Sequence, residues 1–264
     1  MMRWLINLPR LRGWFFDVVA PVTLTLFVLS GWQIYVWLSD IRPQVLPGPI
    51  RIVRESVESA GAIWAHALVT MSEVAAGFAI SIVCALALGL LLDLSTPLRR
   101  AVYPIIVASQ TVPIPVVAPL MIVWFGFGVL PKIIVIGLFT FVPIVLGFAA
   151  GLASTERPTL DLMRTFGSSR WQTYRYVKIP AALPDLFTGL RIAAIYAVLG
   201  AIFGELAGAT DGLGIFLEQS RLSFRTDLVF GAIFVVALLS YLLFLAVVLI
   251  ERRAIPWHFQ RRES

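Results

Sequence analysis

The chain has 264 residues, of which 59% are hydrophobic and 14% are charged, and its mean hydropathy is +0.90. This composition excludes an ordinary soluble domain and indicates an all-α membrane protein, because roughly 20 apolar residues make one membrane-crossing helix. The formal charge of +6 would suggest nucleic-acid binding in a soluble protein. Here the basic residues flank apolar runs, as in membrane proteins, so we expect no nucleic-acid partner.

Six apolar runs predict membrane spans within a single transmembrane domain that covers residues 1–264. The first run is too long for the core of a signal peptide and lacks a small-residue cleavage site, so we expect it to be retained. Near the ends of the second run, Glu73 and Asp93 are expected to reach into the interface. The spans are expected at about 18–38, 71–92, 104–126, 132–151, 186–207 and 229–250.

The first loop, about residues 39–70, is expected on the outside with a helix of its own over about 46–66. Val53, Val57 and Trp64 recur at helical spacing with charged residues between them, which predicts an amphipathic helix in the outer interface. Two interpretations stay open. The helix either forms a lid or a contact for an extracytoplasmic binding protein, or it only covers the rim of the bundle.

The third run contains a predicted break at SQTVPIPVVAP, residues 109–119. Its prolines lack N–H groups and lie too close together for one regular helix. Irregular backbone at membrane depth persists only inside protein or along a wet cavity. We therefore expect this break to line a translocation pathway, with a packing kink as the alternative. The candidate pathway residues here are Gln110, Thr111, Pro113, Pro115 and Trp124.

A polar stretch at 155–184 interrupts the hydrophobic second half of the chain. Gly167 permits a sharp reversal after a first short helix. Ser169 and Gln172 have the spacing of a capping box, which predicts a second helix that stops before Pro180. A helix–glycine–helix with aromatic side chains predicts a docking surface for a cytosolic partner. The alternative is an ordinary basic loop with two amphipathic helices.

The fourth run carries Gly147 and Gly151. The fifth run carries small residues spaced by four in two sets, namely Gly189, Ala193 and Ala197, then Gly200, Gly204 and Gly208. This spacing lets helix backbones approach closely. It predicts packing within the bundle, with a dimer seam or a pore lining as the alternative.

Glu205 lies near the end of the same run. A carboxylate there is costly toward lipid, so it should face protein or a water-filled cavity. It either sets the charge of the pathway and contributes to gating, or forms hydrogen bonds to the neighbouring backbone.

Basic residues predict the orientation, since they concentrate on the cytoplasmic side. With the N-terminus inside, fifteen lie inside and six outside, so both termini and residues 155–184 are expected in the cytoplasm. The inner set is Arg3, Arg10, Arg12, Arg99, Arg100, Arg157, Arg164, Arg170, Arg175, Lys178, Arg191, Arg252, Arg253, Arg261 and Arg262. The outer set is Arg42, Arg51, Arg54, Lys132, Arg221 and Arg225.

The sequence predicts no catalytic, cofactor or metal site. The lysines, Lys132 and Lys178, are preceded by Pro131 and Val177, so no G-x4-G-K-[ST] phosphate loop exists. Neither H-E-x-x-H nor G-x-S-x-G occurs, which argues against a membrane-embedded enzyme.

Two motifs resemble the inner-membrane permease subunits of bacterial ABC importers. Their coupling loop has the form EAA-x3-G-x9-I-x-LP. Here Asp161-Leu162-Met163 stands where that family has Glu-Ala-Ala, Gly167 matches the glycine, and VKIP at 177–180 follows nine residues later. The segments QTVP at 110–113 and WFGFG at 124–128 are similar to the permeases for nitrate, taurine, aliphatic sulfonates, riboflavin and thiamine pyrimidine precursors. The QTVP variant leans toward the riboflavin and pyrimidine-precursor branch.

The resemblance implies a type I importer fold in the bacterial inner membrane, surrounded by lipid. Two permease copies form the pathway, separate ATPase subunits dock on residues 155–184, and an extracytoplasmic binding protein delivers the solute. The residues that it places at the ATPase contact are Asp161, Met163, Phe166, Gly167, Trp171, Tyr174, Val177 and Pro180.

The alternative within transport is a secondary carrier or channel that works without an ATPase. Such proteins usually show paired intramembrane ions or inverted repeats. The sequence indicates neither.

Overall fold

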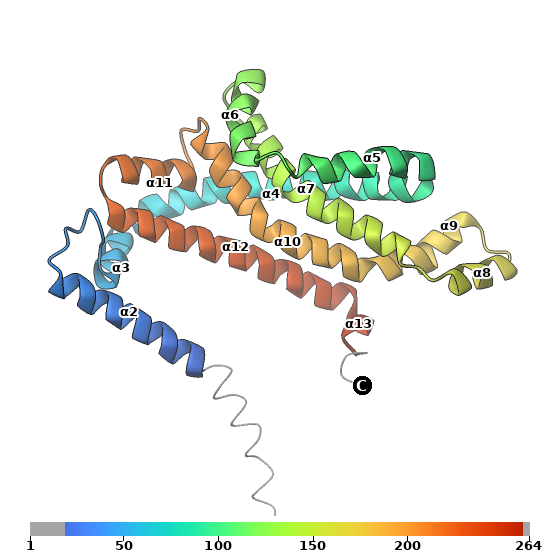
Figure 1. Ribbon diagram of the computed structural model, residues 1–264, viewed down its shortest axis with the longest axis horizontal. Coiled ribbons are helices and arrows are strands. Elements are labelled where there is room, and N and C mark those ends of the chain that lie inside the picture. Colours follow the sequence, from blue (N-terminus) through green and yellow to red (C-terminus); the bar gives the residue numbers. More distant parts are fainter. Residues whose placement is uncertain (1–18, 261–264) are drawn as a thin grey trace, which may run out of the picture. The chain divides into compact units, whose positions relative to one another are not determined.

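The computed structural model describes residues 19–260, and every regular element in that range is a helix (Figure 1). Arg3, Arg10, Arg12, Arg261 and Arg262 lie outside the described residues, as does residue 18 of the first expected span. The helices are α2 (Ala20–Leu38), α3 (Pro49–Glu58), α4 (Ala60–Leu94), α5 (Thr96–Ser109), α6 (Ile114–Phe125), α7 (Val129–Ala153), α8 (Arg157–Thr165), α9 (Arg170–Thr173), the π-helical η2 (Tyr174–Lys178), α10 (Ile179–Leu206), α11 (Leu213–Leu222), α12 (Thr226–Ala254) and α13 (Pro256–Gln260).

Five helical segments of the described chain are long and apolar enough to cross a membrane. They are α2, α4, α7, the continuous run of α9, η2 and α10, and α12. A sixth is counted if the bent pair of α5 and α6 is one span. The predicted all-α membrane class is therefore confirmed.

The described residues form two compact units. The smaller one contains residues 19–61 and 219–231, where α2 packs on α3. In this unit the Ile50 N–H donates to Gln33 Oε1 at 3.1 Å, and the rings of Trp32 and Phe230 lie 5.5 Å apart. The larger unit contains residues 62–218 and 232–260 of the described chain.

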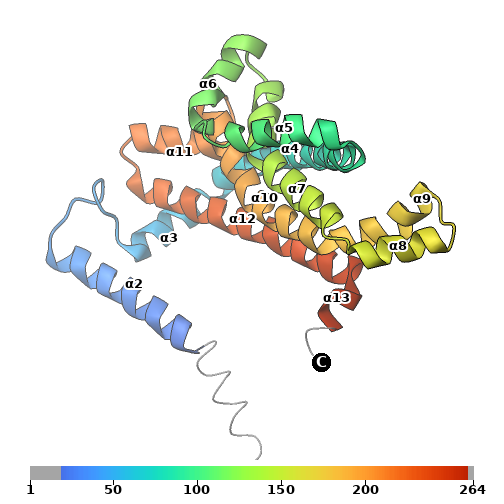
Figure 2. The same cartoon turned by 45° about the vertical axis from the view of Figure 1, so that its right-hand side comes forward.

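Helices α7 and α10 lie side by side at the centre of the larger unit in both views (Figures 1 and 2). Ile136 and Ile144 from α7 are fully buried, as are Ala193 and Ala197 from α10. These side chains pack against one another in a close-packed interface between α7 and α10, which we call the seam. This core sets the positions of the segments attached at both ends of α10.

Small residues make the seam between α7 and α10 possible. A Cβ added at Gly147 would lie 2.6 Å from the Asp185 carbonyl oxygen, and one at Gly151 would lie 2.7 Å from the Ala182 carbonyl oxygen. On the α10 side, a Cβ at Gly200 would lie 3.0 Å from the Cα of Ile136. The predicted packing role of these small residues within the bundle is confirmed.

The break expected in the third apolar run is confirmed. α5 and α6 meet at an angle of 101°, so the expected span at 104–126 is two helices rather than one. Pro113 has an extended backbone just before α6 (φ −66°, ψ 106°). Pro115 falls in the first turn of α6, where a missing N–H group leaves no helical hydrogen bond unmade.

The boundary of the first loop is wrong in the prediction. α3 ends at Glu58 and α4 already begins at Ala60, so residues 60–70 belong to a 35-residue helix. This segment, AGAIWAHALVT, contains no proline, aspartate, glutamate, lysine or arginine that would separate it from the apolar run. The helix expected over 46–66 is therefore two helices, divided at Ser59.

The prediction that the second helix of the polar stretch stops before Pro180 is also wrong. The chain stays helical from Arg170 to Leu206. Ile179 N–H bonds to the Tyr174 carbonyl, five residues back, so the turn before the proline is wider than an α-helical turn. This π-helical turn accommodates Pro180, whose ring would clash with the preceding turn of a regular α-helix.

The seam between α7 and α10 predicts opposite effects for the same substitution at two helical glycines. Gly147→Ala places a Cβ against backbone, and overpacking of this kind costs about 1–3 kcal/mol. Gly31→Ala in α2 meets nothing within 4 Å and gains helix propensity of about 1 kcal/mol. We expect the thermal unfolding midpoint to fall for Gly147→Ala only. A fall of equal size in both variants would contradict the close approach.

Candidate functional site

The polar stretch folds into a short helical hairpin, α8 and α9, joined through Gly167. The Ser168 N–H bonds to the Met163 carbonyl at 3.1 Å, and the Gly167 N–H bonds to the Arg164 carbonyl at 2.9 Å. Together they make a Schellman C-cap, which needs the left-handed φ of +68° found at Gly167. The glycine turn predicted from sequence is therefore confirmed.

A capping box starts α9, as its spacing predicted. The Gln172 N–H donates to Ser169 Oγ at 3.2 Å, and the Ser169 N–H donates to Gln172 Oε1 at 2.8 Å. These bonds satisfy N–H groups that a helix start leaves without intrahelical partners. With both helix ends fixed this way, residues 157–173 form a defined element, which we call the elbow.

Large apolar side chains are exposed on and just beyond the elbow. Phe166 is 75% exposed, Trp171 66% and Leu162 54%. Tyr176, in the following π-helical turn, is 66% exposed. On a polar segment such a group of side chains is typical of a protein contact surface. Leu162 and Tyr176 were not among the expected contact residues, although their helical spacing could have identified them.

Asp93, at the end of α4, anchors the chain just beyond the elbow. It accepts hydrogen bonds from the Tyr174 hydroxyl and from the Lys178 ammonium group. The carboxylate is 8% exposed and the Lys178 side chain 15%, and Lys178 Nζ also lies 4.9 Å from the centroid of the Tyr174 ring. Asp93 is therefore buried against these partners and does not reach into the interface as expected. The sequence did not reveal this contact, because the partners lie more than 80 residues further along the chain.

The structure separates the expected ATPase-contact residues into two groups. Asp161, Phe166, Gly167 and Trp171 are exposed on the elbow. The others are partly buried, at Met163, Tyr174, Val177 and Pro180. The first group is available to a partner, and Tyr174 in the second joins the elbow to α4 through Asp93.

Glu205 is fully buried at the far end of α10. Its Oε1 accepts from the Thr70 hydroxyl at 2.6 Å and its Oε2 from the Gly214 N–H at 2.6 Å. The Thr70 oxygen also accepts from the Leu213 N–H at 2.9 Å, and the His66 Nδ1 accepts from the Gly212 N–H at 3.0 Å. The carboxylate thus joins α4, α10 and the start of α11, where the positive end of a helix dipole favours it.

A second buried carboxylate, Glu73, forms an ion pair that the sequence did not reveal. Lys132 Nζ lies 2.5 Å from Glu73 Oε1, and the two side chains are 11% and 4% exposed. The pair joins α4 to the first turn of α7. The expected interfacial position of Glu73 is wrong, and so is the expectation that no paired ions occur among the spans.

The expected pathway residues do not form one cluster. Gln110, Thr111, Pro113 and Pro115 lie at or next to the break between α5 and α6, and all four are exposed in the single chain. On the last turn of α6, Trp124 is 65% exposed. Gln110 lines a cavity beside the break, whereas Glu205 belongs to the separate buried network.

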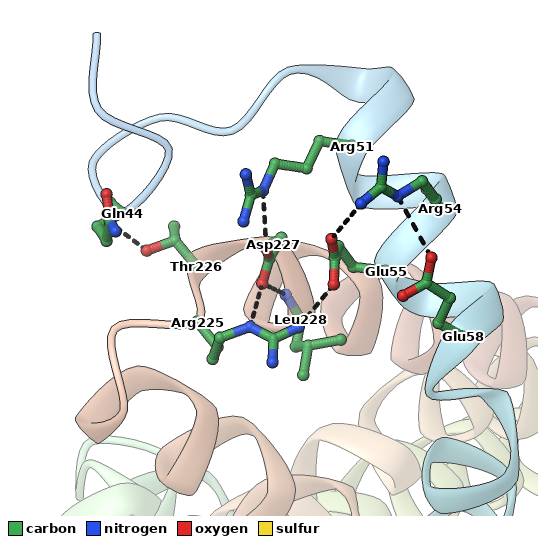
Figure 3. A network of polar contacts seen from close by, with 9 residues as sticks. All are labelled: Gln44, Arg51, Arg54, Glu55, Glu58, Arg225, Thr226, Asp227 and Leu228. Atoms are coloured by element: carbon green, nitrogen blue, oxygen red, sulfur yellow. Dashed lines mark hydrogen bonds and ion pairs between the residues drawn. The ribbon is translucent and has the colours of Figure 1, made fainter.

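In the smaller unit, an ion network holds α3 against the first turn of α12 (Figure 3). Asp227 accepts from Arg51 Nε at 3.0 Å and from Arg225 Nε at 3.1 Å. The same Arg225 guanidinium reaches Glu55 Oε2 at 2.9 Å. The charged face of α3 is therefore occupied within this unit, while its apolar face, including Val53, is exposed.

Comparison with known proteins gives consistent matches over most of the chain. Residues 77–256 match the family model of the binding-protein-dependent transport system inner membrane component. The chain is 36% identical to the formylaminopyrimidine transport permease ThiX of Halalkalibacterium halodurans, over 92% of this chain and 97% of that protein. It is 37% identical to the riboflavin transport permease RibX of Chloroflexus aurantiacus, over 90% and 89%.

A more distant relative is the taurine transport permease TauC of Escherichia coli, which is 30% identical over 94% of both chains. Among solved structures, the MetNI methionine ABC transporter in an inward-facing conformation matches with a TM-score of 0.58 and 22% identity. The match covers 74% of this chain and 94% of that one. It supports the same fold.

The ion pair between α4 and α7 predicts a large loss of stability when one partner is removed. Lys132→Met leaves Glu73 buried without its counter-charge, which costs about 3–5 kcal/mol. Arg164→Met is the matched control, because its ion pair with Asp161 is exposed and contributes about 0–1 kcal/mol. The measurement is the thermal unfolding midpoint of each purified variant.

The double variant Glu73→Leu/Lys132→Met removes both charges and should recover much of the loss. Equal midpoints for Lys132→Met and Arg164→Met would contradict the buried pairing.

Proposed function

The chain belongs to the family of binding-protein-dependent transport system inner membrane components, and on this premise we propose that the elbow receives the force of ATP hydrolysis. The protein is a multi-pass inner-membrane permease subunit of an ATP-driven ABC importer. It has no ATPase site of its own, and a partner ATPase hydrolyses the nucleotide. A secondary carrier or channel is therefore not the function of this chain.

The observation that carries the coupling proposal is the exposed apolar surface of the elbow. Leu162, Phe166 and Trp171 are more than half exposed on a helical hairpin whose backbone is fixed by caps at its turn. A preformed surface loses less conformational entropy when a partner binds. An ATPase that docks on these side chains would bury apolar area on a rigid element and could push it as one piece.

Asp93 supports the next step of the coupling. Its contacts with Tyr174 and Lys178 join the base of the elbow to α4, and α9 continues through η2 into α10. Movement of the elbow would therefore be passed to two spanning helices at once. Coupling that travels along packed, hydrogen-bonded elements of this kind has a physical carrier.

We place both termini and the elbow on the cytoplasmic side, since the distribution of basic residues favours that orientation. A second copy of the chain is proposed as the other wall of the pathway. The support for it is that Gln110, Thr111 and Pro115 are exposed in the single chain. Lipid is the proposed neighbour of α2, which contains no buried residue.

For the solute, we propose a small nitrogen heterocycle of the formylaminopyrimidine or riboflavin type. The relatives named for these two compounds are 36% and 37% identical to the chain. The relative named for taurine is 30% identical. In this arrangement an extracytoplasmic binding protein presents the solute, as the family implies.

Gly167→Val tests the coupling role of the elbow. A residue at φ +68° with a branched Cβ costs roughly 1–2 kcal/mol in the left-handed region, so we expect the Schellman turn to open. The matched control is Gly31→Val, since neither glycine has an atom within 4 Å of an added Cβ. In proteoliposomes with the ATPase and binding protein, Gly167→Val should lose solute uptake that is coupled to hydrolysis. Normal ATPase docking and uptake in this variant would count against the proposal.

A further inference from the structure

A cavity of about 500 Å³ lies between α4, α5, α6 and α7 in the larger unit. It opens beside the break at residues 110–113. Most of its walls are aliphatic, with Ser81, Ser109 and Gln110 as the polar side chains. Cys84, the single cysteine of the sequence, also lines it. Ligand sites in proteins are commonly concave and apolar with a few placed polar groups.

No charged side chain is among the residues that line this cavity. Helices α4 and α7 also carry the buried charges of Glu73 and Lys132, but these two side chains pair with each other. The buried Glu205 is already bonded to Thr70 and Gly214. An anion such as a sulfonate would enter the cavity without a counter-charge and lose its hydration, which is costly. The cavity therefore favours an uncharged ligand.

The break leaves hydrogen-bond acceptors without partners beside the cavity. The carbonyl oxygens of Gln110, Thr111 and Val112 accept no hydrogen bond from the described residues. Pro113 and Pro115 supply no N–H group, which interrupts the helical bonding pattern here, and the Val116 N–H bonds to the Pro113 carbonyl instead. Gln110 and Val112 are among the residues that line the cavity, so a ligand that carries N–H groups and reaches this end of the cavity can bond these acceptors.

The side chain of Gln110 adds a hydrogen-bond donor beside these backbone acceptors. Its amide has no partner in the described residues and is exposed at the wall. An amide both donates and accepts, and so it can pair with an amino group and ring nitrogen, or with a ring carbonyl and N–H, on one edge of a planar heterocycle. The aliphatic walls would then take the faces of the ring.

From this combination we propose that the cavity is a binding site in the permease itself for an uncharged, N–H-bearing nitrogen heterocycle. The ligand places its polar edge on Gln110 and on the free carbonyls of the break. The proposal rests on the function proposed above and deepens it, because it gives the permease a share in solute selection. It excludes taurine and other sulfonates as ligands of this site.

Cys84 supplies the test, since no other cysteine needs to be removed. We would measure the rate at which a small neutral maleimide labels Cys84 in the full-length permease in lipid nanodiscs. Riboflavin, formylaminopyrimidine and taurine would each be present in turn. The proposal expects several-fold slower labelling with at least one of the two heterocycles and an unchanged rate with taurine.

Two substitutions establish that the protection comes from this site. Gln110→Ala should lose the protection, expressed as the ratio of its own labelling rates with and without solute, whereas Gln44→Ala, at an exposed glutamine outside the cavity, should keep it. Gly137→Leu should slow labelling without any solute, because Gly137 lines the cavity and an added Cβ meets only Ser81 Oγ, at 3.6 Å. Gly31→Leu is the matched control with an unchanged rate.

Three results would overturn the proposal. The first is equal protection by taurine and the heterocycles, and the second is protection that persists in Gln110→Ala. The third is that no solute protects Cys84 and that the labelling rate instead changes with the acyl chains of the nanodisc lipids. This result would show that lipid occupies the cavity. ATP-dependent uptake by the reconstituted importer is measured separately, so loss of the cavity site and loss of the transport function remain distinguishable.

Discussion

The close approach of α7 and α10 is the constraint on which the larger unit depends. Backbones at Gly147, Gly151 and Gly200 lie where no larger residue fits without displacement of the neighbouring helix. Lipid tails are as apolar as leucine, so helices in a membrane gain little by simple burial of apolar side chains. Close packing through small residues supplies the association instead, and it fixes both the separation and the relative height of the two helices.

With α10 fixed on α7, three acidic residues determine how α4 and its other neighbours pack around this pair. Glu205 joins the C-terminal end of α10 to α4 and α11, and Asp93 joins α4 to the base of the elbow. Glu73 joins α4 to α7. Buried ion pairs add little net stability over apolar packing of the same volume, but an unpaired member is very costly. These contacts therefore act mainly to exclude other registers of α4 against its neighbours.

The sequence predicted what local chemistry determines. The turn at Gly167, the capping box at Ser169 and the break near Pro113 follow from a few adjacent residues, and the small-residue seam follows from a spacing of four. The partners of Glu73 and Asp93 could not be predicted, since they lie 59 and more than 80 residues away and depend on how helices pack. The continuation of the helix past Pro180 was missed for a related reason, because a π-helical turn is not visible in residue spacing.

The π-helical turn also bears on the proposal that movement of the elbow reaches α10. The run from Arg170 to Leu206 has 37 residues and extends about 55 Å at 1.5 Å per residue, well beyond a hydrocarbon core of about 30 Å. A rod of this length transmits a push only if it does not bend where its hydrogen bonds are irregular. Tyr174 and Lys178 are the first and last residues of that irregular turn, and Asp93 binds both. In the coupling role proposed for the elbow, the carboxylate would brace the turn at which force would otherwise be lost as bending, and this gives a reason for burying an acidic residue at the end of α4.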